Sequence, residues 1–215
     1  MNLTATSHSW DESVALFERR GLPESSYENL YDETYDVHPG SLAVDGELDL
    51  DALDLHGTGL VVDGDLTVTG PVLNLDDGCP ALVVLGDLTA GAVYLGGDAK
   101  LLVRGSVKAG AFVGHMTDKL VMIGGDLAAG VTVLSNGFFP DLVGGALTGP
   151  VLAPAYALAE LENEVTEGVA AEVLLPELLR ADGEEDERFF DAPGVHGDRL
   201  FARLEAGRPV LRLPA

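Results

Sequence analysis

The chain has 215 residues, of which 36 are acidic and 12 are basic, so its formal net charge is −24 at pH 7. A surface this negative repels nucleic acid and anionic lipid, and the charge therefore argues against binding to either. The start of the sequence lacks a positive region followed by an apolar one, and no apolar run approaches the roughly 20 residues that cross a bilayer. We expect a soluble, cytoplasmic protein without a membrane partner.

The negative charge is concentrated in the first half of the chain. From Gly21 to Ala99 the sequence has many aspartates and glutamates but no lysine or arginine. Such a stretch steers basic partners toward it. Adaptation of a whole proteome to salt produces the same composition, so both explanations stay open. Five aspartates of this stretch are our candidate partner-binding residues: Asp49, Asp51, Asp54, Asp76 and Asp77.

The chain has a single cysteine, Cys79, which limits its redox and metal chemistry. One thiol forms neither an internal disulfide nor a zinc cluster nor a redox pair. This favours a reducing compartment, in agreement with a cytoplasmic location.

The N-terminal region, residues 1–40, is predicted to be a helical cap. Trp10, Val14 and Phe17 recur at helical spacing in the stretch from Trp10 to Arg20. Ser9 or Asp11 is suited to cap the first turn of this helix, because its side-chain oxygen can accept from the free backbone N–H groups there.

Residues 41–155 contain an internal repeat, which decides the fold class. Each repeat places alternating apolar residues on both sides of a glycine, as in LVVDGDLTVTG from Leu60 and LVVLGDLTAG from Leu82. The spacings between these glycines are 18, 22, 19, 20 and 20 residues. The aligned glycines are Gly46, Gly64, Gly86, Gly105, Gly125 and Gly145.

This repeat predicts a β-solenoid. Alternation marks strands with one buried side, and we expect the glycine to take a corner conformation that residues with a β-carbon resist. Stacked turns then form internal ladders of aliphatic side chains. One ladder is predicted from Leu66, Leu88, Val107, Leu127 and Leu147, and another from Val62, Val84, Val103 and Ile123. The unequal turn lengths favour a right-handed parallel β-helix of five to six turns.

The C-terminal region, residues 156–215, is predicted to be a second helical cap, so that both open ends of the solenoid are covered. Tyr156 to Arg180 reads as one or two helices, and an acidic loop follows from Asp182 to Arg188. A last helix is expected at about Asp198 to Glu205, before a short strand from Pro209 to Leu213.

An acidic residue follows the aligned glycine in four repeats: Glu47, Asp65, Asp87 and Asp126. A column of carboxylates can hold calcium, but the glycine-rich nonapeptide of calcium-binding β-rolls is absent. The commoner role is an aspartate that accepts a hydrogen bond from the backbone of its own turn. We therefore predict no metal site.

Elements of catalytic and cofactor sites are sparse in the sequence. The five histidines are scattered without a metal-ligand spacing, and His115 with Asp118 is the most site-like pair. There is no phosphate-binding loop with a lysine and no G-x-S-x-G elbow, so no cofactor is expected. The clustered aspartates could serve a polysaccharide-degrading β-helix, although such enzymes are usually secreted and carry long loops.

The recurring G-D-L with alternating valines, as in VVDGDLTVTG and VVLGDLTAG, resembles the bactofilins. These bacterial cytoskeletal β-helices stack end to end into filaments, and the resemblance implies a polymerising scaffold. Bactofilins generally have short disordered tails where this chain has predicted helices, and covered ends would block filament growth.

The chain is also similar in kind to small, acidic, intracellular β-solenoid proteins of bacteria, among which we expect antitoxin and immunity proteins. That resemblance implies a non-catalytic inhibitor that binds a basic partner, such as a toxin, and it transfers no functional residues. We take this as the leading hypothesis. The polymerising scaffold and the polysaccharide enzyme are the alternatives.

Overall fold

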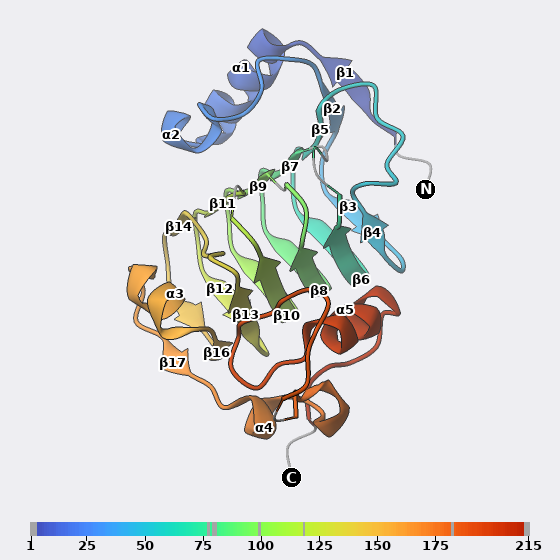
Figure 1. Cartoon of the computed structure of the whole chain (residues 1–215). Coiled ribbons are helices and arrows are strands. Elements are labelled where there is room, and N and C mark those ends of the chain that lie inside the picture. Colours follow the sequence, from blue (N-terminus) through green and yellow to red (C-terminus); the bar gives the residue numbers. More distant parts are fainter. Residues whose placement is uncertain are drawn as a thin grey trace.

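The computed structural model describes residues 4–76, 78, 81–98, 100–117, 119–181 and 183–212. The chain is mainly β and forms a β-solenoid of about six turns of parallel strands, as the repeat predicted (Figure 1). The predictions that involve Asp77, Cys79 and Asp118 lie outside the described residues. The handedness of the coil stays a prediction.

The first sheet forms one side of the solenoid from short strands contributed by successive turns. Its order is β1-β2-β5-β7-β9-β11-β14. All neighbours pair in parallel except β1, which pairs with β2 in the antiparallel direction. The strands are β1 (Thr6–His8), β2 (Tyr35–His38), β5 (Gly59–Val62), β7 (Ala81–Val84), β9 (Lys100–Val103), β11 (Leu120–Ile123) and β14 (Leu142–Val143).

The second sheet is bent, so that it forms the other two sides of the solenoid. The long strand β10 shows the bend, because its first half pairs with β12 and its second half with β13. The order along the sheet is β17-β16-β13-β10-β8-β6-β3, and β4, β12 and β15 pair beside this path. The strands are β3 (Leu42–Val44), β4 (Leu48–Asp49), β6 (Leu66–Asn74), β8 (Leu88–Leu95), β10 (Val107–His115), β12 (Leu127–Ala129), β13 (Thr132–Ser135), β15 (Leu147–Thr148), β16 (Pro150–Leu152) and β17 (Thr166–Glu167).

The interior is built from aliphatic columns in register, and both predicted ladders are confirmed. Leu66 pairs with Leu88, and Leu88 with Val107, while Val62 pairs with Val84 on the first sheet. A third inward column was not predicted and consists of Leu48, Val72, Val93, Phe112, Thr132 and Val151. Burial of each valine or leucine contributes about 1.5–3 kcal/mol.

The aligned glycines are required for a reason other than the one predicted. Of the six, only Gly46 has a positive φ, at +89°. Its predicted alignment is wrong, because Leu42 pairs with Leu66, so that Gly40 matches Gly64, and Gly46 lies against Gly70 of the second turn. At the other aligned glycines the turns stack so closely that a β-carbon would collide with the turn before. On Gly86 it would meet Asp65 Oδ1, and on Gly105 it would meet Asp87 Oδ1. The prediction of a special backbone conformation at every corner is therefore wrong, and close approach is the cause.

A second column of glycines, which was not predicted, marks the bend in the second sheet. A β-carbon on any of these residues would collide with a backbone oxygen of the turn before. They are Gly70, Gly91, Gly110, Gly130 and Gly149. Each turn therefore has two glycine corners, and at these corners the backbones of successive turns lie almost in contact.

The N-terminal helix α1 (Trp10–Arg20) begins and ends as predicted. Ser9 caps it in a reciprocal pair with Glu12, and Gly21 ends it at φ 74°. With α2 (Glu24–Tyr27), it packs on the outer surface of the first sheet, where Phe17 joins a cluster with Val61 and Val83. These helices cover a side of the solenoid (Figure 1), while β1 covers the edge of the first sheet.

The C-terminal region closes one end of the solenoid and one of its sides. The helix α3 (Ala155–Glu160) places Ala157 in the core at the end of the tube, and Asn163 Nδ2 donates to the carbonyls of Val143, at 3.1 Å, and Gly145, at 2.8 Å. The side is covered by α4 (Ala170–Val173), the 3-10 helix η1 (Pro176–Leu178) and α5 (Gly197–Glu205). No helix among the described residues has the length and apolarity needed to span a membrane.

Candidate functional site

The acidic column beside the corner glycines has a structural role. Asp65, Asp87 and Asp126 each accept a hydrogen bond from the backbone N–H of the matching residue in the next turn, so for these three the prediction of a bond within the same turn is wrong. Glu47 does not belong to this column, whose first member is Ser41, and Ser106 fills the place between Asp87 and Asp126. The acceptor–donor pairs are Ser41–Asp65 at 3.0 Å, Asp65–Asp87 at 2.9 Å, Asp87–Ser106 at 2.8 Å, Ser106–Asp126 at 3.0 Å and Asp126–Ala146 at 2.8 Å. Within the described residues, no group of three or more potential ligands could hold a metal ion.

The predicted partner-binding aspartates lie at the N-terminal end of the solenoid, but they differ in what they contact. Asp51 holds the next turn, because its Oδ2 accepts from Leu75 N at 2.6 Å and its Oδ1 from Asn74 Nδ2 at 3.1 Å. Asp49 Oδ1 accepts from Asp51 N at 3.0 Å. Asp54 and Asp76 are exposed. Asp51 is thus a structural residue, while Asp54 and Asp76 face solvent.

The first turn leaves one edge of the second sheet open. In the described part of the chain, no strand pairs with the outer edge of β3 or β4. Acidic residues lie between β3 and β4, on β4 and in the segment after it, and we call Asp45, Glu47, Asp49 and Asp54 the acidic edge. Asp45 Oδ1 also accepts from Thr69 Oγ1 of the second turn at 3.0 Å. Charges at an open edge discourage pairing with another strand, and they also attract a partner of opposite charge.

The acidic edge has no basic counter-ion. No described lysine or arginine forms an ion pair with any of its four carboxylates. By contrast, Asp63 on the neighbouring surface pairs with Arg20 Nε at 2.5 Å. The field of the acidic edge is therefore not neutralised within the described molecule.

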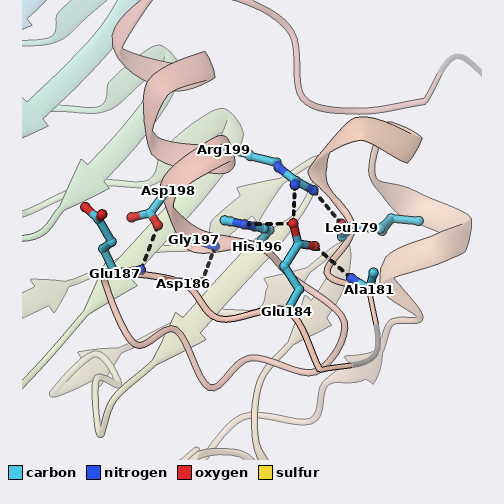
Figure 2. A network of polar contacts seen from close by, with 9 residues as sticks. All are labelled: Leu179, Ala181, Glu184, Asp186, Glu187, His196, Gly197, Asp198 and Arg199. Carbon is cyan, nitrogen blue, oxygen red and sulfur yellow. Dashed lines mark hydrogen bonds and ion pairs between the residues drawn. The ribbon is translucent and has the colours of Figure 1, made fainter.

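Acidic side chains of the predicted loop near residue 185 form an ion pair and hydrogen bonds with α5 (Figure 2). Glu184 pairs with Arg199, lies 3.6 Å from His196 Nε2 and accepts from Ala181 N at 3.0 Å. The pKa of Glu184 lies below its ordinary value, first because of that backbone bond and then because Arg199 is near. The buried Asp186 accepts from Gly197 N at 2.6 Å. Glu184 and Asp186 therefore stabilise the loop.

An open groove lies beside the acidic edge. One wall is the first turn, with Asp45 and Glu47, and the other is the end of α5, with Glu205. Its volume is about 470 Å³. Three carboxylates therefore line a single groove between elements that are far apart in the sequence.

His115, the most site-like histidine in the sequence, is a core residue. It is 5 % exposed, and its ring stacks on Phe190 with the centroids 4.7 Å apart. Burial first, and then the positive charges of Lys119 and Arg188, lower its pKa to about 4. The ring is therefore neutral at pH 7, which suits packing.

A second polar cluster, centred on Asp191, was not found from the sequence. Its Oδ1 accepts from Ser135 Oγ at 2.9 Å and from Asn136 N at 2.7 Å, and its Oδ2 accepts from Tyr156 Oη. Burial acts to raise the pKa of Asp191, but the hydrogen bonds from Tyr156, Asn136 and Ser135 outweigh it, so the pKa lies below its ordinary value. Ser135 is fully buried, so this cluster holds the C-terminal region in place.

Backbone strain gathers around the same cluster. Among the described residues, those other than glycine with a positive φ are Met116 at 69°, Asn136 at 53° and Phe189 at 53°. Met116 N donates to Ser135 O, Asn136 N donates to Asp191, and Phe189 precedes the ring that stacks on His115. Phe189 is 79 % exposed. No pattern in the sequence predicts this convergence.

Fold and site together define an acidic β-solenoid with one open, uncompensated edge. No family model, curated protein or solved structure matches the chain. Its function therefore has to be argued from its own residues.

Proposed function

We propose that the protein is a non-catalytic binding protein that inhibits a basic protein partner, and that the acidic edge makes the contact. The observation that carries this proposal is the contrast between two groups of acids. Glu184, in the loop near residue 185, and Asp63 are each paired with an arginine, whereas the carboxylates of the acidic edge have no described counter-ion. Inhibition by coverage needs no catalytic group of its own.

The physical basis is electrostatic steering followed by neutralisation. Asp45, Glu47 and Glu205 line one groove, and like charges so close repel one another. A lysine or arginine of a partner relieves this repulsion, and the field speeds encounter. Because exposed charges are screened with a Debye length of about 8 Å at physiological ionic strength, the association should weaken with salt.

The covered C-terminal end supports a binding role over end-to-end polymerisation. Asn163 donates hydrogen bonds to the carbonyls of Val143 and Gly145 at the edge of β14, and α3 packs over the core. A further molecule cannot extend the solenoid there unless this region moves. Sedimentation velocity tests the alternative, since filaments formed by the intact chain would favour the scaffold.

The test compares the acidic edge with an equal number of acids elsewhere. The edge variant is D45N/E47Q/D49N/D54N. The matched control is E160Q/E162Q/E164Q/E172Q, which removes four exposed acids with no described ion pair. Each bait is used for affinity purification from cells of the source organism, and each captured protein is then purified and titrated against all three baits at low and high salt.

We expect a basic protein that binds the wild type and the control in a 1:1 complex and is lost from the edge variant and at high salt. Recovery of no such protein contradicts the proposal. Equal binding to all three baits contradicts it as well, because the edge would then serve only to prevent strand pairing. Circular dichroism checks that the variants fold.

A further inference from the structure

A second groove lies along the bend of the second sheet, under the end of α5. Its floor is formed by the second glycine column and the small residues that follow it, and its wall by the chain leaving α5. Its volume is about 270 Å³. The floor comprises Thr69, Gly70, Pro71, Gly91, Ala92, Gly110 and Ala111, and the wall Leu204 and residues 207–211.

This apolar groove continues directly into the acidic groove. Thr69, Gly70, Pro71 and Gly207 line both. Gly46 of the first turn lines the acidic part, and Gly110 of the fourth turn lines the apolar part. The two therefore form one groove parallel to the solenoid axis. Over the fifth turn Leu211 fills the continuation, since its Cδ1 lies 2.4 Å from the position that a β-carbon of Gly130 would take.

The groove is polarised along its length. Three carboxylates, from Asp45, Glu47 and Glu205, line the end at the first turn. The part at the second to fourth turns has a mainly apolar lining, with Leu204 and Val210 in its wall, and the exposed Arg208 lines it as well. A ligand that fits it carries positive charge at one end and aliphatic side chains along the rest.

The dimensions favour an extended peptide. Successive turns are about 4.8 Å apart, so the path from the first turn to the fourth is about 14 Å, which about four residues of extended chain would span at about 3.3 Å each. A second copy of the chain would bring a net charge of −24 to an acidic groove.

We propose that this groove binds an extended segment of a partner protein, with lysine or arginine at the first turn and two or three aliphatic residues over the second to fourth turns. The inference rests on the proposed function and adds the chemistry of the recognised segment. Both parts of the groove contribute to specificity, because a ligand with only basic residues leaves the apolar part empty and a ligand with only aliphatic residues leaves the carboxylates unpaired.

Two variants alter the groove without touching the core. E205K reverses one charge at the acidic end, and A206W fills the space beside it; both residues are exposed. The matched controls are E172K, on α4, and A202W, on another part of α5. Both control residues are exposed, and neither lines the groove.

The probe is a labelled five-residue peptide with two arginines followed by leucine, valine and leucine, measured by fluorescence polarisation. One comparison peptide replaces the apolar residues with glycine and serine, and the other replaces the arginines with glutamates. We expect the first peptide to bind best, with E205K and A206W weakening it about five- to tenfold and the controls leaving it unchanged.

Three results overturn the inference: no binding of the first peptide, equal binding of the peptide without apolar residues, or unchanged binding by both groove variants. A dimer of the wild type that A206W dissociates also overturns it, because a second copy would then be the occupant. Failure of the proposed function looks different. If the captured partner binds the edge variant D45N/E47Q/D49N/D54N normally, the proposed function fails; if capture depends on that edge but is indifferent to A206W and E205K, only the groove inference fails.

Discussion

Asp87 Oδ1 accepts a hydrogen bond from the backbone N–H of Ser106, the matching residue in the following turn, at 2.8 Å. The same carboxylate oxygen lies 2.1 Å from the position that a β-carbon of Gly105 would take, which is far too close for one to fit. One aspartate therefore joins two turns and also requires glycine at the next corner. The recurring G-D pair in the sequence is thus a stacking device, and its acids are already committed to the fold.

The first prediction concerns this bond. Asp87→Ala leaves the N–H of Ser106 without its acceptor, and we expect a loss of about 1 kcal/mol in the free energy of unfolding, measured with urea. Asp87→Asn keeps a side-chain oxygen in the same place, so its loss should be smaller. Equal losses for the two variants would mean that the negative charge, and not the hydrogen bond, joins the turns.

The interior of the solenoid follows from the sequence because it depends on local alternation. Leu88 and Ala90 point inward by the period of two, and the corner glycine fixes where each turn begins. After Gly91 the inward positions become Val93 and Leu95, so one residue is skipped at the bend. The sequence contains this skip, and attention to it would have predicted the third side of the solenoid.

The candidate site was less predictable, because side-chain roles depend on residues distant in the sequence. In the sequence Asp51 cannot be told from the acids around it, and only the structure shows that Asn74 and Leu75 of the next turn donate to it. Asp191 accepts from Ser135, which is 56 residues earlier. Nothing local in the sequence distinguishes these bound carboxylates from the free one of Asp54.

The second prediction concerns pH and His115. Its pKa falls from 6.5 to about 4 in the folded protein because of burial, and then because of Lys119 and Arg188, while the nearby acids Asp186 and Asp191 act in the opposite direction. The unfolded chain therefore binds the proton more readily. The neutral ring's contribution is fully present above pH 6.5 and is lost as the pH falls toward 4.

This loss amounts to about 3 kcal/mol at most. His115→Leu has no ring to protonate, so this pH-dependent loss should be absent from the variant. Between pH 6.5 and pH 4 the free energy of unfolding, measured with urea, should therefore fall more in the wild type than in the variant. Carboxylates elsewhere titrate in both proteins and cancel in the difference. Parallel pH profiles would show that the ring stays accessible to protons in the folded state.

The third prediction concerns the cover over the C-terminal end. Asn163 Nδ2 donates to the carbonyls of Val143 and Gly145. Asn163→Ala removes both bonds and should cost about 1–2 kcal/mol, while Asn163→Asp should cost more, because a carboxylate would face two carbonyl oxygens. Urea unfolding measures both. If the aspartate variant is the more stable of the two, the amide does not donate to this edge.

The last prediction separates strain from function at Phe189. This ring is 79 % exposed and its φ is 53°, a conformation that costs a residue with a β-carbon of order 1–3 kcal/mol. Phe189→Gly should therefore raise the free energy of unfolding by about 1 kcal/mol. Phe139, which is 38 % exposed and has no positive φ, is the matched control, and Phe139→Gly should destabilise the protein. If the Phe189→Gly variant is more stable and still binds the basic partner, the Phe189 ring lies outside the contact, in agreement with binding at the acidic edge. If the variant loses binding, the contact extends to the Asp191 cluster.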